Sequence, residues 1–283
     1  MNALTDCYKL SNGVGIPCIG FGTFQMQNGE TAVSAVEAAI GAGYRHIDSA
    51  QGYHNEESVG IAVKNSGVAR KDLFITTKLA NTEHGYEKTV AAFERSLQKL
   101  DMDYIDLFLV HWPNPAGFRS NWQEANAGTW KAFEEFYNAG RIRSIGISNF
   151  HRHHIEALMR TAKIAPMVNQ IRLCPGDTQD EIVDYCRTMD IVLEAYSPLG
   201  AGGIFDVPEM KALAGKYGKS IAQICVRWSL QRGYLPLPKS ASQPRIVENA
   251  DVFGFELSGD DVQLIADLKG CVGYSTHPDT APF

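Results

Sequence analysis

The sequence has 283 residues, of which 45% are hydrophobic and 20% charged, which is enough for a large apolar core. Its formal net charge is -6 and its basic residues are scattered, so no nucleic-acid partner is expected. No apolar run approaches membrane-spanning length, and the first ten residues lack a basic segment followed by an apolar core. We therefore expect a cytoplasmic protein that has no membrane partner.

Six cysteines are spread along the chain without a C-x-x-C pair and without a metal-type spacing to histidine. They stand at positions 7, 18, 174, 186, 225 and 271. Reduced cytosolic thiols are the simplest interpretation, and no bound metal is expected.

The chain opens with a predicted hairpin, residues 8–10 and 14–16, around an Asn-Gly turn. Apolar runs then alternate with segments of helical periodicity. The predicted strands are 19–21, 45–48, 73–77, 105–110, 144–147, 167–170, 191–195 and 235–237. The predicted helices are 30–42, 56–64, 88–100, 129–138, 153–161, 179–189, 221–231 and 245–249.

Eight strands that alternate with helices favour a closed (β/α)8 TIM barrel over the alternative, an open doubly wound sheet. No linker-like segment divides the chain, so we expect one domain over residues 1–283. The stretch 13–18 (GVGIPC) begins like a dinucleotide-binding glycine loop. Cys18 replaces the last glycine and Pro17 stands where a helix should open, so that fingerprint is absent.

Three consecutive predicted strands each lead to an ionisable residue: Asp48, Lys78 and His111. Tyr53 follows Asp48 by five residues, in the turn that leaves its strand. Because the carboxyl ends of parallel strands share one rim, these four side chains are expected to form the active site. Each alone is more often a structural or solvated residue, but their joint placement favours catalysis.

With the predicted barrel and these four residues, the sequence resembles the aldo-keto reductase superfamily over nearly its whole length. Its short C-terminal tail is similar to that of bacterial members. The motifs that carry the resemblance are 20–23 (GFGT), 43–50 (GYRHIDSA), 103–107 (DYIDL), 111–113 (HWP), 145–150 (IGISNF), 195–200 (AYSPLG), 238–240 (PKS) and 245–249 (RIVEN).

The resemblance implies an NADPH-dependent reductase of aldehydes, ketones or dicarbonyls that uses Tyr53 as general acid. Free tyrosine is a weak acid at neutral pH, so Lys78 is expected to lower its pKa while Asp48 holds Lys78 charged. His111 would direct the carbonyl through a ring N–H. Substrate contacts are expected at Phe24, Gly52, Tyr53, His111 and Trp112.

The resemblance also implies a nicotinamide site at Ser148, Asn149 and Gln170, with Tyr196 against the ring. Lys239, Ser240 and Arg245 would form an anion site suited to a 2′-phosphate, so NADPH is expected over NADH. An isolated basic pair is otherwise ordinary surface charge. The expected cofactor-binding set is Gly22, Thr23, Asp48, Ser148, Asn149, Gln170, Tyr196, Ser197, Leu199, Lys239, Ser240, Arg245, Glu248 and Asn249.

Three positions depart from the family pattern. Arg172 stands where many relatives carry an acid, and His54 replaces a common glycine. Gly52 replaces a branched apolar residue, and it either widens the substrate pocket or supplies a positive φ.

Asp103 and Asp106 are interpreted as structural. No functional pattern is found at His46, His151, His153 and His154. The last three are expected on a solvated helix start.

Two further functions stay open at this point. The same fold serves as a cofactor-sensing interaction subunit of potassium channels, and the same site could oxidise an alcohol with NADP in the cell. We expect a monomer whose partner is a small carbonyl compound. The substrate loops are expected over 113–129 and 201–207.

Overall fold

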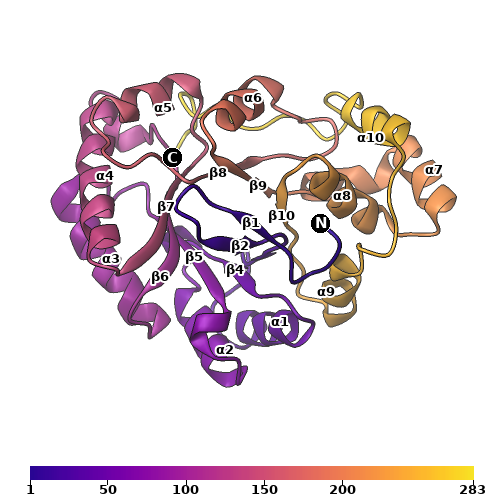
Figure 1. The fold of residues 1–283 in the computed structure, drawn as a ribbon, viewed down its shortest axis with the longest axis horizontal. Helices are drawn as coiled ribbons and strands as arrows, with labels where there is room; N and C mark the ends of the chain where they lie inside the picture. Colours follow the sequence, from indigo (N-terminus) through magenta and orange to yellow (C-terminus); the bar gives the residue numbers. More distant parts are fainter.

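The computed structural model describes all 283 residues, and its main feature is an eight-stranded parallel sheet that closes into a barrel surrounded by helices (Figure 1). Backbone hydrogen bonds of 3.1 Å from Gly20 to Pro236 and from Gly22 to Pro238 join the first strand to the last. The predicted barrel is confirmed and the open sheet is excluded. The barrel strands are β3 (Phe21–Gly22), β4 (His46–Asp48), β5 (Phe74–Leu79), β6 (Ile105–Val110), β7 (Ile142–Ser148), β8 (Val168–Arg172), β9 (Val192–Tyr196) and β10 (Leu235–Leu237).

All eight predicted helices are present, and none of the helices in the structure is long and apolar enough to cross a bilayer. The helices are α1 (Glu30–Gly41), α2 (Glu56–Asn65), α3 (Tyr86–Leu100), α4 (Trp122–Asn138), α5 (Arg152–Met159), α6 (Asp180–Thr188), α7 (Pro208–Tyr217), α8 (Ile221–Gln231), α9 (Gln243–Ala250) and α10 (Gly259–Ala266). Short 3-10 turns are η1 (Gln51–Tyr53), η2 (Arg70–Asp72), η3 (Ala116–Phe118) and η4 (Gly200–Asp206).

Helices α7 and α10 were not predicted, and α4 begins at Trp122 rather than at residue 129. The missed first turns of α4 are polar or small, so they lack an apolar stripe of helical period. They are helical because Ala125 and Asn126 are buried against the rest of the barrel. The expected substrate loop 113–129 is therefore shorter than predicted.

The barrel strands are buried on both faces, as the near-continuous apolar runs of β5 and β6 require. Phe108 of β6 stacks on Phe133 of α4 with ring centres 4.6 Å apart, and Trp130 packs on the same ring. Burial of each such side chain contributes about 1.5–3 kcal/mol relative to exposure. This packing supplies a rigid frame for side chains at the strand ends.

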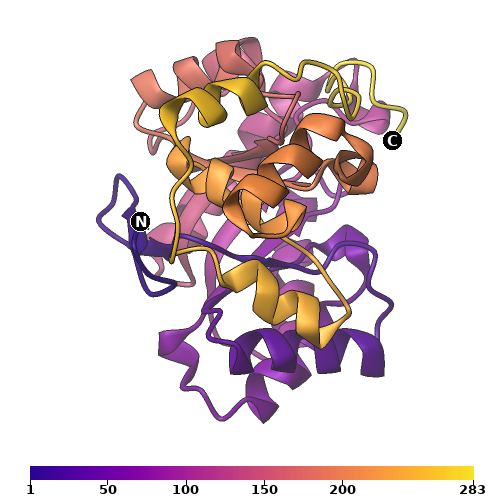
Figure 2. The same cartoon turned by 90° about the vertical axis from the view of Figure 1, so that its right-hand side faces the viewer.

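The N-terminal hairpin covers one end of the barrel. Strands β1 (Cys7–Lys9) and β2 (Gly15–Pro17) pair antiparallel around the predicted turn, with Tyr8 opposite Ile16. The Tyr8 hydroxyl donates to the carbonyl of Tyr234, just before β10, so the hairpin lies over the amino ends of the strands. Figure 2 shows the chain termini on opposite sides of the molecule, with the C-terminal tail on the side away from the hairpin.

Candidate active site

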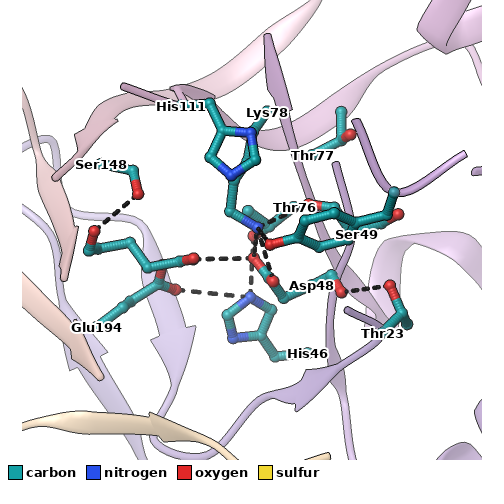
Figure 3. Close-up of polar contacts among 12 residues, drawn as sticks. Thr23, His46, Asp48, Ser49, Thr76, Thr77, Lys78, His111, Ser148 and Glu194 are labelled. Carbon is teal, nitrogen blue, oxygen red and sulfur yellow. Dashed lines mark hydrogen bonds and ion pairs between the residues drawn. The ribbon is translucent and has the colours of Figure 1, made fainter. Parts of the chain in front are cut away.

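The first two site residues meet because neighbouring parallel strands bring them into register. Asp48 is the last residue of β4 and pairs with Thr76 of β5. Lys78, two residues farther along β5, points to the same face. Its fully buried Nζ lies 2.7 and 2.8 Å from the two Asp48 carboxylate oxygens and 2.8 Å from the Ser49 carbonyl (Figure 3).

Tyr53 reaches this pair from η1, the 3-10 turn that follows β4. Its hydroxyl oxygen lies 3.2 Å from Lys78 Nζ. Gln51 holds the turn in place, because its side-chain amide donates to the Ala92 carbonyl and accepts from the Ala80 N–H. His54 ends the turn with φ 58°, a conformation that favours glycine, and this explains why glycine is common at that position.

The electrostatics of the group differ in one respect from the prediction. Burial raises the pKa of Tyr53, and although Lys78 acts in the opposite direction, burial outweighs it. The expected net lowering of the tyrosine pKa was therefore wrong. Burial would lower the pKa of Lys78, but Asp48 and Tyr53 outweigh it and raise it. Tyr53 thus keeps its proton at neutral pH beside a charged ammonium.

His111 directly follows β6 and faces Tyr53, with ring centres 5.7 Å apart. Burial, and then the charge of Lys78, lower the pKa of His111 to about 3, so its imidazole is neutral and carries one N–H. Neither ring nitrogen is hydrogen-bonded within the chain. That N–H is available to a carbonyl oxygen.

A second layer of buried polar groups lies beneath Asp48, on the side away from His111 (Figure 3). Gln170 Nε2 donates to Asp48 at 2.9 Å and to Glu194 at 2.8 Å. Burial, with the nearby Asp48 charge, raises the pKa of Glu194 to about 8, and burial lowers that of His46 to about 3. The 3.6 Å contact between Glu194 and His46 is therefore one of neutral groups.

Sequence reasoning missed Glu194. The available signal was an acid inside the otherwise apolar strand β9, since a buried acid requires a hydrogen-bond partner.

The site opens into a cavity of about 1260 Å³ at the carboxyl ends of the strands. Of the predicted residues, all but two line it. The two exceptions are Lys78, which lies below its floor, and Thr23, whose buried hydroxyl donates to the Asp48 carbonyl. Thr23 thus holds the loop and does not face the cavity. The predicted residues that line it are Gly22, Phe24, Asp48, Gly52, Tyr53, His111, Trp112, Ser148, Asn149, Gln170, Tyr196, Ser197, Leu199, Lys239, Ser240, Arg245, Glu248 and Asn249.

The side of the cavity around Tyr53 has an aromatic wall. The Phe24 and Tyr53 rings lie 5.0 Å apart, and Trp112 meets Phe283 edge-on at 4.9 Å. Phe283 was missed because nothing in the sequence indicates where the last residue folds. Phe205 also lines the cavity, whereas Trp122 packs against histidines outside it.

The side of the cavity that carries Ser148, Asn149 and Gln170 presents amide groups of defined orientation. The side chains of Asp48 and Glu194 both accept from Gln170 Nε2, so the Gln170 side-chain oxygen is left to accept an N–H. Asn149 Nδ2 donates to the His111 carbonyl and to Ser148, and its oxygen accepts from the Tyr196 hydroxyl at 2.9 Å. The free Gln170 oxygen fits the two N–H donors of a carboxamide.

Two exposed cations, Lys239 and Arg245, stand at the other end of the cavity and form no salt bridge within the chain. Arg245 lies in the first turn of α9, and Ser240 lies between the two on the loop. Unpaired cations beside helical N–H groups suit a phosphate. The lining residues therefore fit a phosphorylated dinucleotide.

Of the other two departures from the family pattern, Arg172 has a structural reason. Arg172 pairs with Asp177 at 2.6 Å and donates to the carbonyls of Val272 and Gly273, so it fastens the C-terminal tail. Gly52 has no positive φ, and no atom lies within 4 Å of an added Cβ. The backbone explanation for this glycine is thus wrong.

Asp106, which is predicted to be structural, is fully buried. It forms salt bridges with two arginines, Arg143 at 2.6 Å and Arg70 at 2.7 Å. His154, expected on a solvated helix start, is instead fully buried, so that part of the prediction was wrong.

A family comparison agrees with the barrel fold. The sequence model of the aldo/keto reductase family matches residues 18–269. The chain belongs to this family. A glyoxal reductase of Bacillus subtilis (strain 168) is 47% identical over 281 residues, which is 99% of either chain.

Solved structures of the family superimpose on this aldo/keto reductase. A crystal structure of an aldo/keto reductase from Brucella melitensis has a TM-score of 0.89 and 45% identity, covering 95% of this chain and all of the other. An aldo-keto reductase from Bombyx mori, solved in complex with NADP, has a TM-score of 0.86 and 35% identity, covering 96% and 94%. The chain is thus an oxidoreductase of this family.

Proposed function

We propose that this aldo/keto reductase uses NADPH to reduce aldehydes, ketones or dicarbonyl compounds, with Tyr53 as general acid. The observation that carries the proposal is the Lys78 ammonium, which contacts both the Asp48 carboxylate and the Tyr53 hydroxyl at the floor of the cavity. The relative named glyoxal reductase supports dicarbonyl compounds as candidate substrates. The six unpaired cysteines support a reducing, cytoplasmic environment.

The cofactor would lie along the cavity. Ser148, Asn149 and the Gln170 oxygen would bind the carboxamide, and Tyr196 would cover the ring. Lys239, Ser240 and Arg245 would hold the 2′-phosphate, with Glu248 and Asn249 at the adenine. When bound, this group supplies the hydride that reduces the carbonyl carbon.

The chain's own residues manage the proton. A carbonyl oxygen held between His111 and Tyr53 would accept a hydrogen bond from the His111 imidazole N–H. It would then take up the phenolic proton of Tyr53. Lys78 would stabilise the phenolate that remains, and Asp48 keeps Lys78 charged and oriented. Because each of these steps is reversible, the same residues would serve alcohol oxidation, with the phenolate as base.

A carbonyl panel followed by the absorbance of NADPH tests the proposal, with glyoxal, one aromatic aldehyde and one ketone as probes. Tyr53→Phe is the matched control because it leaves the ring in place. NADPH consumption that depends on Tyr53 is the expected result. Retention of NADPH without turnover of any carbonyl, or of an alcohol with NADP, would overturn it and favour a cofactor-sensing subunit.

A further inference from the structure

Glu194 is a buried acid to which the proposed reduction assigns no role. It lies inside the barrel on β9, fully buried and in register with Gln170 of β8. It accepts one hydrogen bond within the chain, from Gln170 Nε2 at 2.8 Å, whereas its other oxygen, Oε1, has no hydrogen-bond partner. An acid that is removed from water with a single hydrogen bond costs the fold free energy, which points to a role for the bond that it does make.

Two further neighbours of Glu194 form no hydrogen bond with it. His46 Nε2 lies 3.6 Å from Glu194 Oε1, beyond hydrogen-bond distance, and instead contacts Thr76 Oγ1 at 2.9 Å (Figure 3). On β10, the strand next to β9, the residue in register with Glu194 is the apolar Leu235. Gln170 is therefore the group on which Glu194 acts directly.

The Gln170 amide is fixed by two acceptors on different strands. Its Nε2 donates to Asp48 of β4 at 2.9 Å and to Glu194 of β9 at 2.8 Å, so both hydrogens of this nitrogen are used. The Asp48 carboxylate binds the Lys78 ammonium and can only accept, which requires the amide nitrogen to face it. With that bond alone, the amide could still turn about the line that joins donor and acceptor. The second acceptor fixes the plane of the amide, and hence the direction in which its oxygen is presented at the cavity that Gln170 lines.

We propose that Glu194 is a positioning residue for cofactor recognition, which fixes the Gln170 amide so that its oxygen accepts an N–H of the nicotinamide carboxamide. This inference rests on the proposed function, because it requires the carboxamide to lie against Gln170. A side chain that is already held in its binding orientation loses less conformational freedom when the ligand arrives, so affinity rises without a new contact. Glu194 does not line the cavity, so it would act only through Gln170.

A purely structural role for Glu194 makes a different prediction. If Glu194 only supported the barrel, its loss would lower stability and would weaken the binding of every nucleotide that enters the cavity to the same degree. A positioning role affects only a nucleotide that offers an N–H to Gln170. The oxidised 3-acetylpyridine analogue of NADP⁺ separates the two roles, because a methyl group replaces its carboxamide nitrogen while the ring and the 2′-phosphate are kept.

Isothermal titration of the full chain with NADP⁺ and with this analogue tests the inference. The pH is kept well below 8, the approximate pKa to which burial raises the Glu194 carboxyl group, so that Glu194 stays neutral. In Glu194→Met, which lacks the oxygen acceptor, NADP⁺ binding should weaken about three- to tenfold, the value of one neutral hydrogen bond. Binding of the analogue should change less than about twofold.

Two further variants serve as controls. Glu194→Gln keeps an oxygen that can accept from Gln170, so it should bind NADP⁺ as the wild type does. Thr76→Val removes the contact with His46 from the same buried layer but leaves Gln170 unchanged. It should therefore lose stability and keep the wild-type ratio of the two affinities.

Should Glu194→Met fail to fold, Glu194→Asp, which withdraws the acceptor by one methylene group, should show the same selective loss. The inference is overturned if the ratio of the two affinities is unchanged in the variants that remove or withdraw the acceptor, or if Glu194→Gln loses NADP⁺ as selectively as Glu194→Met. Absence of NADP⁺ binding by the wild type would overturn the proposed function, and this inference with it.

Discussion

The Lys78 ammonium lies 3.2 Å from the Tyr53 hydroxyl and 4.7 Å from the centre of the same ring, so the charge is placed at the oxygen end of the phenol. A cation at that distance stabilises the phenolate that proton donation would leave. Burial alone makes the tyrosine a weaker acid, so the contact with Lys78 is what allows a buried tyrosine to release its proton.

The first prediction concerns this pair. Tyr53→Phe removes the proton donor but keeps the ring, so carbonyl reduction should fall about 10²- to 10⁴-fold while NADPH binding survives. Single-turnover kinetics and a cofactor titration measure the two effects. A loss below roughly tenfold would contradict the role of general acid.

Lys78→Met should reduce turnover similarly, and it should also destabilise the fold because Asp48 is left buried without its cation. Breaking a buried ion pair costs about 3–5 kcal/mol, so chemical denaturation must accompany the kinetics. Full activity in a stable Lys78→Met protein would exclude Lys78 from the proton transfer.

Cofactor choice is predicted to depend on Lys239 and Arg245. Replacement of either by alanine should weaken NADPH binding about ten- to hundredfold, since a charge-assisted bond is worth roughly 1.5 to 3 kcal/mol. NADH binding should change little, because neither side chain is paired with another part of the protein. Fluorescence titrations with both cofactors measure the ratio, and an equal loss for both would show that the pair acts on structure instead.

Substrate shape is predicted to depend on Gly52. Because an added Cβ meets no atom within 4 Å and the backbone φ is ordinary, Gly52→Ile should fold normally and fill space beside Tyr53. The value of kcat/KM should fall for a carbonyl compound with a branched neighbouring group and be spared for a small aldehyde. Gly52→Ala is the matched control with little filling, and a uniform loss on both substrates would refute the pocket explanation.

Stability is predicted to fall between about pH 4.5 and pH 8 because of Glu194. Its folded pKa of about 8 lies above the ordinary value of 4.5, so the folded state holds an extra proton between these values. The free energy of unfolding contributed by this group is therefore full below about pH 4.5 and is lost as the pH rises through 8. Urea denaturation at several pH values between about 4.5 and 8 should show a shallower decline in Glu194→Gln. An identical decline in both proteins would mean that Glu194 does not titrate there.

Much of the architecture was predictable because it depends on local pattern. Eight apolar runs, each followed by a helical period, determine a barrel, since parallel strands buried on both faces require covering helices. Asp48, Lys78 and His111 could be grouped in advance because each stands at a strand's carboxyl end. Helix α7, and the first turns of α4, lacked such a pattern, and their helicity depends on packing against distant segments.

Only the tertiary structure decided which side chains of the site are charged and where the last residues of the chain pack. The direction of the Tyr53 pKa depends on the balance between burial and one ammonium, and no spacing in the sequence reports burial. Glu194 lies 24 residues from Gln170, and Asp279 lies 125 residues from His154, yet both pairs share hydrogen bonds. The sequence by itself determined the barrel and the residues on its rim, because strand order follows chain order. Only closure of the barrel brought the second polar layer and the tail to that rim, because contacts between distant residues form once the whole chain is packed.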